Sequence, residues 1–304
     1  MNSQTLLRFV AALRTAKGRE HYWQAFLSRS WLWLGRLPWE IRLHRRLDGR
    51  LPMRLSTRDR VISRAIFSTG VWEAQELRFI KSYVKSGMVT VDIGANIGAH
   101  TLAMADRVGP TGVVHAFEPT RVFETLQHNI SKNGFQAQVR LNRCALGAKE
   151  GTARFMACKP GYELFTSRGA PLISEAATGE FIEFPVTTLD QYAEQHGIRH
   201  IHFLKVDVEG SEDAVFQGCS RLLADHSIDC MMLELNDICL VNSGASGVGL
   251  LRRIHGAGYY TYMLDETGFE PLPESVAGMA FNVIAMREPM RITGVPQEWE
   301  HASV

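Results

Sequence analysis

The sequence predicts a doubly wound α/β fold, in which a mainly parallel sheet carries helices on both faces. Two observations predict it. Apolar runs of strand length alternate with segments of helical periodicity along residues 65–288, and several of these runs end in an acidic residue or a glycine turn. The chain has 304 residues, of which 45% are hydrophobic, so it can bury a sizeable core.

The stretch over residues 89–101 is expected to organise this domain. Val89, Val91 and Ile93 alternate with smaller or polar residues, which is typical of a buried strand. Helical spacing of apolar residues begins at Ile97, within a turn that contains two glycines. Such a turn lets a ligand approach the backbone, and the N-terminus of the helix offers unpaired N–H groups to a carboxylate or phosphate.

The turn reads Gly94-x-Asn96-x-Gly98, which is one residue shorter than the dinucleotide fingerprint G-x-G-x-x-G and has an asparagine in its middle. It contains no Lys or Arg for a phosphate. The acid at Asp92 and the amide of Asn96 instead suit a ligand that carries an amine, a carboxylate and a ribose. S-adenosylmethionine is such a ligand.

The other elements follow from the same periodicities. The expected strands span residues 112–118, 138–146, 202–210, 228–235, 259–264 and 279–286. The expected helices are an amphipathic one over residues 72–85, three that begin near Pro119, Thr188 and Ser211, and one over residues 248–255. The side chains of Thr188 and Ser211 are expected to cap their helices.

Residues 148–187 interrupt this alternation. Short strands are expected over residues 153–156 and 181–186, and the segment between them is rich in Gly, Pro, Ser and Thr. A connection this long in a compact domain is usually functional or disordered. We expect residues 157–180 to form a flap on the substrate side, whereas residues 289–304 form a tail without a pattern.

Residues 1–64 form a basic, Trp-rich arm. They hold 14 Lys/Arg and 4 Asp/Glu, a net charge of +10, whereas the other 240 residues hold 19 and 28, a net charge of −9. Four of the six tryptophans lie in the arm, and residues 41–47 have the spacing of a basic amphipathic helix. The arm could lie on an anionic membrane surface, bind nucleic acid, or pack against the domain or a second copy of the chain. Nucleic acid is the least favoured partner, because no recognition motif is visible.

The cysteines and the apolar runs indicate the cellular compartment in which the protein is expected. The five cysteines are odd in number and form no C-x-x-C pair, which predicts reduced thiols in a cytoplasmic protein. No run approaches the roughly 20 apolar residues of a membrane-spanning helix. Arg8 breaks the apolar run over residues 6–13, so no signal peptide is expected. Any membrane contact would therefore be peripheral.

Several motifs occur in the order seen in FkbM-type methyltransferases, and residues 65–286 resemble that family. The motifs are Asp92-Ile-Gly-Ala-Asn-Ile-Gly98 followed by Thr101, Phe117-Glu-Pro119, Ala145-Leu-Gly147, Thr188-Leu-Asp190 and Leu204-Lys-Val-Asp-Val-Glu-Gly-Ser-Glu212. The resemblance implies a Rossmann-like class I methyltransferase, whose sheet has seven mainly parallel strands with the last one antiparallel. It also implies S-adenosylmethionine-dependent O-methylation of a hydroxyl on a glycan, glycolipid or natural product.

The resemblance also implies a donor site. The glycine turn and the acid before it would hold the methionine end, and residues around Cys144 would lie beside the adenine. Glu118, 26 residues beyond Asp92, would hold the ribose, because a carboxylate has two oxygens for a vicinal diol. The expected donor-binding residues are Asp92, Gly94, Ala95, Asn96, Gly98, Thr101, Glu118, Pro119, Cys144, Ala145 and Asp207.

A hydroxyl acceptor must lose a proton, which calls for a base within hydrogen-bond reach. Asp207 and Glu209 are candidates, because they end a strand at the carboxyl edge of the sheet and would face the same way. Alternatively, one orients the donor and the other caps the next helix. His100, one turn into the glycine helix, is a third candidate, or else it replaces an aromatic residue common in the family.

Other possibilities stay open in the sequence. The oxygens of Asp207, Glu234, Asn236 and Asp237 could gather around Mg²⁺, although no metal is expected. The protein could methylate nucleic acid through its basic arm. It could also be a cofactor-binding module without methyl transfer, but the presence of the expected acids gives that alternative no support.

Overall fold

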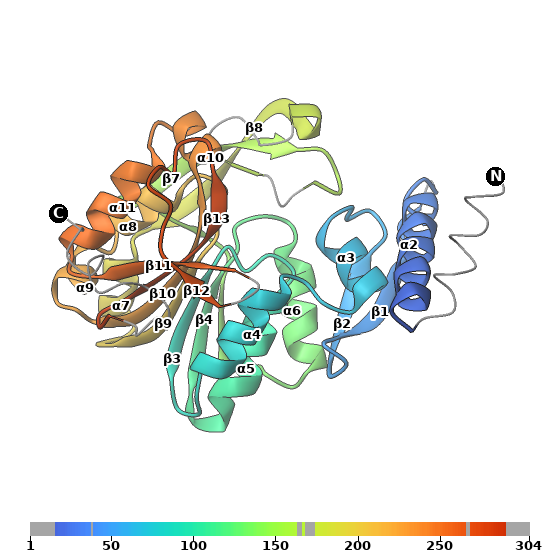
Figure 1. Ribbon diagram of the computed structural model, residues 1–304, viewed down its shortest axis with the longest axis horizontal. Coiled ribbons are helices and arrows are strands. Elements are labelled where there is room, and N and C mark those ends of the chain that lie inside the picture. The colour runs from blue at the N-terminus through green and yellow to red at the C-terminus, as the bar shows by residue number, and fades with distance from the viewer. Residues whose placement is uncertain (1–15, 38, 163–165, 168–173, 266–267, 290–304) are drawn as a thin grey trace.

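A central sheet organises the structure, a computed structural model that describes residues 16–37, 39–162, 166–167, 174–265 and 268–289 (Figure 1). The strands of this sheet are β3 (Val89–Ile93), β4 (Val113–Phe117), β5 (Val139–Asn142), β9 (Ile201–Val206), β10 (Ile228–Asn236), β11 (Tyr260–Leu264), β12 (Phe269–Glu270) and β13 (Ala280–Met286). They lie in the order β12-β11-β13-β10-β9-β3-β4-β5. Strands β10, β9, β3, β4 and β5 run parallel, and β13 is antiparallel to both of its neighbours.

The predicted fold class is confirmed, including the antiparallel last strand. The sheet has eight strands rather than the expected seven, because the two-residue strand β12 pairs with the outer edge of β11. Helices cover both faces (Figure 1). They are α4 (Ala74–Tyr83), α5 (Ala99–Val108), α6 (Phe123–Lys132), α7 (Leu189–Gln195), α8 (Glu212–Gln217), α9 (Ser220–Ala224), α10 (Asp237–Asn242) and α11 (Gly247–Gly256), with the 3-10 helices η1 (Gly109–Thr111) and η3 (Ser174–Ala176).

Alternate residues of the strands feed two separate cores. In β10, Cys230 and Met232 pack with residues of α4, α5 and α6, whereas Met231 and Leu233 pack with residues of α7, α8, α9 and α11. All four side chains are at most 1% exposed. Burial on both faces explains why these strands read as nearly continuous apolar runs in the sequence.

A smaller second sheet lies at the carboxyl side of the first. It consists of β6 (Ala145–Leu146), β7 (Gly151–Cys158) and β8 (Ala177–Thr187) in the order β6-β8-β7. The single strand expected over residues 138–146 is therefore wrong, because the chain leaves the central sheet after β5 and enters the second sheet at β6. The expected flap over residues 157–180 includes ends of β7 and β8, but its residues 163–165 and 168–173 lie outside the described part.

The N-terminal segment contains α2 (Ala16–Leu34), a hairpin of β1 (Arg42–Leu47) and β2 (Leu51–Ser56), and α3 (Ile62–Thr69). The expected basic helix over residues 41–47 is wrong, because this stretch is a strand. Two features of the structure are typical of a hairpin. The buried side chains of β2 alternate strictly, and the turn contains Asp48-Gly49, both with positive φ (49° and 69°).

The tryptophans of this segment have different surroundings. Trp31 is fully buried, packs 4.9 Å from the ring of Phe67, and its indole N–H donates to the carbonyl of Asp59 at 2.8 Å. Trp23 and Trp33 are 60% and 63% exposed on α2. In the described residues, no helix is both long enough and apolar enough to cross a membrane. Peripheral membrane contact of the arm stays a prediction, and cosedimentation with anionic vesicles tests it.

Asn129 of α6 ties the hairpin to the glycine turn. Its side chain is fully buried, accepts a hydrogen bond from the N–H of Arg54 at 2.7 Å and donates to the carbonyl of Ile97 at 2.9 Å. One amide therefore joins β2, α6 and the start of the glycine helix. A polar side chain at this depth needs both bonds, since an unpaired buried donor or acceptor is costly.

We expect Asn129→Ala to lower the free energy of unfolding by about 2–3 kcal/mol, because it leaves the N–H of Arg54 and the carbonyl of Ile97 unpaired. Urea unfolding followed by circular dichroism measures this change. Gln136→Ala, at an exposed position just beyond α6, is the matched control and should change stability little. Equal effects of the two substitutions would contradict the role of Asn129.

Candidate active site

The glycine turn adopts a left-handed backbone at Gly94, Asn96 and Gly98, with φ of 84°, 48° and 94°. A Cβ at Gly94 would lie 1.8 Å from the carbonyl oxygen of Asp207, and one at Gly98 would lie 2.7 Å from Leu126. Both glycines are therefore required by the packing of β3 against the end of β9 and against α6. Gly94 also lines the cavity described next, and the expectation that this turn lets a ligand approach the backbone stays a prediction.

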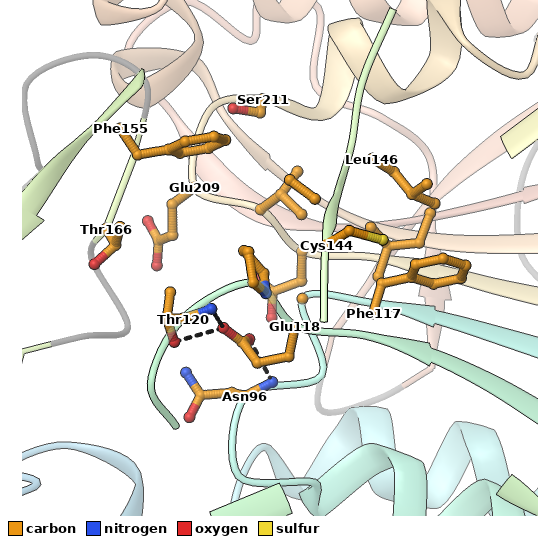
Figure 2. A pocket seen from close by; sticks show the side chains of 16 residues that line it. Asn96, Phe117, Glu118, Thr120, Cys144, Leu146, Phe155, Thr166, Glu209 and Ser211 are labelled. Atoms are coloured by element: carbon orange, nitrogen blue, oxygen red, sulfur yellow. Dashed lines mark hydrogen bonds between the residues drawn. The ribbon is translucent and has the colours of Figure 1, made fainter. Parts of the chain in front are cut away.

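A narrow cavity of about 60 Å³ lies beside the turn, at the carboxyl ends of β3, β4 and β9 (Figure 2). The expected donor-binding residues that line it are Gly94, Asn96, Glu118, Pro119, Cys144, Ala145 and Asp207. Those that lie outside its lining are Asp92, Ala95, Gly98 and Thr101. The candidate base Glu209 also lines it. Phe117, Leu146, Phe155 and Thr166 contribute further walls that sequence reasoning did not single out.

Glu118 is the most constrained side chain of the cavity. It is 4% exposed, and one carboxylate oxygen accepts from the N–H of Asn96 at 2.9 Å. The other oxygen accepts from the N–H and the hydroxyl of Thr120, at 2.8 and 2.6 Å (Figure 2). Three of its roughly four acceptor positions are thus taken. These hydrogen bonds lower the pKa of Glu118, but burial outweighs them, so the pKa is raised above its ordinary value.

Asp92 and Thr101 lie behind the turn. Asp92 is fully buried, and its Oδ2 accepts a hydrogen bond from the Thr101 hydroxyl at 2.6 Å. Its Oδ1 has no hydrogen-bond partner among the described residues. Burial raises the pKa of Asp92. The structure thus gives these two residues a place in the support of the turn.

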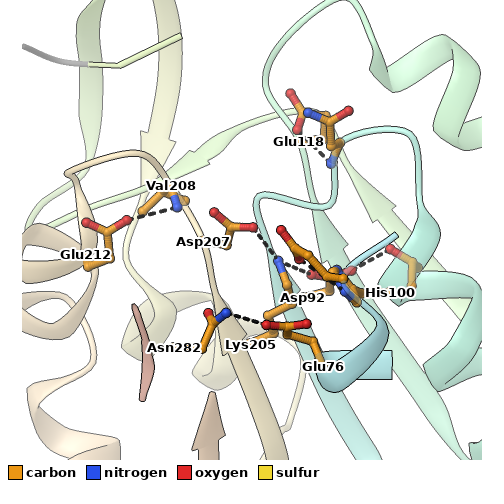
Figure 3. Close-up of polar contacts among 12 residues, drawn as sticks. Glu76, Asp92, His100, Glu118, Lys205, Asp207, Val208, Glu212 and Asn282 are labelled. Carbon is orange, nitrogen blue, oxygen red and sulfur yellow. Dashed lines mark hydrogen bonds and ion pairs between the residues drawn. The ribbon is translucent and has the colours of Figure 1, made fainter. Parts of the chain in front are cut away.

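Lys205 connects this support to the cavity (Figure 3). Its ammonium is 2.9 Å from Oδ2 of Asp207 and 3.9 Å from Oδ1 of Asp92, and the residue is 4% exposed. Burial lowers the pKa of Lys205, but the carboxylates of Asp207, Asp92 and Glu73 outweigh burial and raise it above its ordinary value. Sequence reasoning missed Lys205, although a lysine within an apolar strand was a visible signal.

His100 faces a second acid behind the turn. Its Nε2 lies 3.4 Å from Oε2 of Glu73, without the geometry of a hydrogen bond. Burial lowers the pKa of His100 well below its ordinary value, so the imidazole is neutral. Burial, followed by the charge of Asp207, raises the pKa of Glu73 to about 8. His100 is 5% exposed and lies outside the lining of the cavity.

Asp207 and Glu209 do not share an extended strand, because β9 ends at Val206 and Glu209 has a positive φ of 49°. The expectation that they face the same way as strand neighbours is therefore wrong. Ser211 does not cap α8 with its side chain either. Instead, one oxygen of Glu212 accepts from two backbone N–H groups of this turn, at 3.1 and 3.2 Å. The expected cap at Thr188 is confirmed.

The acidic side chains at the ends of β9 and β10 lie close together. One oxygen each of Asp207, Glu209 and Glu234 lies within 4.8 Å of the other two. Of the Mg²⁺ set considered from the sequence, Asp207 and Glu234 are thus brought together, whereas the other two residues have different partners. Asn236 caps α10, and Asp237 accepts from the N–H groups of Gly247, at the start of α11, and of Gly278. Burial, followed by the charge of Asp207, raises the pKa of Glu209 to about 9 and that of Glu234 to about 10.

A comparison of sequences agrees with this arrangement of a glycine turn, the buried Glu118 and acidic strand ends. A family model described as the methyltransferase FkbM domain matches residues 92–259, more than half of the chain. The chain belongs to this family. The FkbM domain therefore contains the glycine turn, Glu118 and the β9 acids, and the resemblance inferred from the motifs is confirmed.

Comparison with individual proteins also finds methyltransferases. The chain is 32% identical over 200 residues to 31-O-demethyl-FK506 methyltransferase FkbM from Streptomyces tacrolimicus, an alignment that covers 57% of this chain and 74% of that protein. It is 28% identical over 162 residues to Methyltransferase 1 from Beauveria bassiana, covering 48% of this chain and 64% of the relative. Both relatives are named as methyltransferases.

Solved structures give only a distant likeness. An O-methyltransferase from Bacillus cereus in complex with SAH aligns with a TM-score of 0.41 and 14% identity, covering 71% of this chain and 82% of that one. An rRNA methylase from Streptococcus thermophilus aligns with a TM-score of 0.40 and 11% identity, covering 70% and 94%. We base no argument about substrate on these two.

The raised pKa values of Glu73, Glu209 and Glu234 predict how stability depends on pH. Between the ordinary carboxyl pKa of 4.5 and about 9, the folded FkbM domain retains protons that the unfolded chain has lost. The free energy of unfolding of the ligand-free protein should therefore fall as the pH rises through this range. Urea unfolding at about pH 6 and about pH 9 measures the change.

Glu234→Gln removes one of these protonation steps and should flatten the pH dependence. Glu194→Gln, at an exposed position near the end of α7, is the matched control and should leave it unchanged. A ligand-free protein that becomes more stable towards pH 9 would contradict the assignment of protonated buried carboxyls.

Proposed function

We propose that the FkbM domain transfers a methyl group from S-adenosylmethionine to a hydroxyl oxygen of a small molecule, glycan or glycolipid. The observation that carries this proposal is Glu118, a buried carboxylate held by the glycine turn at the end of the strand next to β3. Its place suits the ribose of a nucleoside at the carboxyl edge of a doubly wound sheet. The name of the Streptomyces tacrolimicus relative, which describes methylation of a demethylated oxygen, supports an oxygen acceptor.

The chemistry of the residues that line the cavity suits the donor, but a cavity of about 60 Å³ has to widen to hold it. Rotation of the Thr120 hydroxyl would free a second acceptor position on Glu118 for the vicinal diol. Phe117, Cys144 and Leu146 offer an apolar wall to a purine. The donor would supply the methyl group on a positively charged sulfonium, a charge that suits the carboxylate of Asp207 at the end of β9. The cavity would widen by movement of Phe155 and Thr166, which line it from the flap side.

Among the three candidate bases, Asp207 is best placed to accept the proton of a hydroxyl. It lines the cavity, and Lys205 holds only its Oδ2, which leaves Oδ1 for a substrate. Glu209 is protonated at neutral pH, because its pKa is raised to about 9. His100 is neutral but lies behind the turn. In this proposal Lys205 is a positioning residue that fixes the orientation of the Asp207 carboxylate.

Glu118→Ala should weaken binding of S-adenosylhomocysteine by about 1–3 kcal/mol, because the ribose hydroxyls lose their buried acceptor. Isothermal titration calorimetry measures the dissociation constant. Glu150→Ala, at an exposed position before β7, serves as the control. An unchanged dissociation constant would show that the ribose is held elsewhere.

The reaction itself is tested by label transfer. The protein is incubated with methyl-labelled S-adenosylmethionine and a cell extract, which is then separated into lipids, glycans, metabolites, RNA and protein. We expect label in lipid, glycan or metabolite, and label in RNA or protein would overturn the proposed substrate class. Asp207→Asn should lower turnover more than about tenfold with little change in donor affinity, because it removes the base. Asp225→Asn, at an exposed site, is the control.

An equal loss of turnover and of donor affinity in Asp207→Asn would instead assign Asp207 to holding the donor. Transfer that proceeds at the unsubstituted rate would remove Asp207 from the mechanism.

A further inference from the structure

A second cavity, of about 400 Å³, lies between the β1-β2 hairpin, the start of α3 and the start of α6. Pro160, from the base of the flap, also lines it. Asn96 lines both this cavity and the donor cavity, so the two meet at the glycine turn.

Four arginines line the cavity, and they come from separate places in the chain. Arg42 lies in β1, Arg54 in β2, Arg58 just after the hairpin and Arg121 just before α6. A guanidinium is charged at every physiological pH and presents donors in a planar fork that matches carboxylate, sulfate and phosphate groups. Burial, followed by the charge of Arg42, lowers the pKa of Arg54, which indicates that like charges face each other here.

The acids of the cavity already have partners. Asp59 accepts hydrogen bonds from the N–H groups of Val61 and Ser63, at 2.9 and 2.8 Å. Glu40 accepts from the hydroxyl of Ser56 at 2.5 Å and lies 3.4 Å from Arg42. The third acid is Glu124 of α6. The cavity therefore carries four guanidinium groups against three carboxyls, a formal charge of +1, and the Glu40 carboxylate is the one that pairs with Arg42.

We propose that this cavity binds an anionic group of the methyl acceptor, a carboxylate, sulfate or phosphate borne by a sugar, a glycan or a lipid headgroup. The proposal rests on the proposed methyl transfer and specifies its substrate class. An anion among the four arginines lies on the far side of Asn96 from the donor cavity. A substrate anchored there can extend past the glycine turn with its hydroxyl.

The shape of the cavity favours a small anionic group over a nucleic acid. Its volume falls within the range of about 300–1,000 Å³ that is common for small-molecule sites. Its apolar lining consists of Ile62, Ile97, Val122 and Pro160, so no aromatic ring among these lining residues is available for base stacking. Nucleic-acid recognition in this place would depend on phosphates alone.

The test compares glucose 6-phosphate and glucuronate with uncharged glucose by isothermal titration calorimetry on the full-length protein containing S-adenosylhomocysteine. We expect the two anionic sugars to bind and glucose not to bind. Arg54→Gln and Arg121→Gln should each weaken the anionic sugars at least about tenfold, since each removes charge-assisted hydrogen bonds. Arg252→Gln, at an exposed position on α11, is the control and should leave binding unchanged.

The affinity for S-adenosylhomocysteine is measured separately in each variant, because its loss reports on the donor site and its retention isolates the acceptor site. Thermal unfolding verifies that each variant is folded. Three results would overturn the proposal: absence of binding by both anionic sugars, binding unaffected by either arginine substitution, or inorganic phosphate binding as tightly as glucose 6-phosphate. Tighter binding of single-stranded RNA that depends on Arg54 would also overturn it, in favour of a nucleic-acid acceptor.

Discussion

The site depends on the ion pairs that the buried ammonium of Lys205 makes with two carboxylates. This ammonium links the end of β9 to the support of the glycine turn through Asp207 and Asp92, in an interior where several carboxyls crowd together. An unpaired charge at this depth would be strongly destabilising, so the lysine and its two acids have to be kept as a set. Their register is fixed by the sheet, since Asp92 and Lys205 are directly paired residues of β3 and β9. The geometry of the cavity thus follows from strand pairing as much as from the turn.

Local signals in the sequence predicted much of this architecture. The strand before the glycine turn, the acid at the end of the next strand and the cap at Thr188 all follow from neighbouring residues. The wrong predictions concern residues whose structure is set by pairing with distant parts of the chain. Arg42–Leu47 has helical spacing in isolation, but its pairing with β2 makes it a strand. Residues 145–146 continue an apolar run, but they pair with β8 in another sheet. Lys205 pairs with Asp207 two residues later, but it also pairs with Asp92, which lies more than a hundred residues earlier.

The two cavities differ in their electrostatic character. Carboxyls dominate the end of β9 and β10, whereas arginines dominate the space between the hairpin and α6. Asn96 separates them with a neutral side chain. In the proposed reaction, a cationic donor would meet the carboxylate of Asp207 on one side of this residue, and an anionic acceptor would meet the arginines on the other. The β1-β2 hairpin contributes two of these arginines, Arg42 and Arg54, to the lining of the second cavity.

The second sheet has a mechanical consequence. Strand β8 pairs with β6, so the segment that leads away from the flap is hydrogen-bonded directly to Ala145 and Leu146 of the cavity wall. On the other side, β8 pairs with β7, which carries Phe155. A displacement of β8 cannot leave either wall untouched. The two walls of the cavity are consequently joined into one hydrogen-bonded unit, of which β8 is the middle strand.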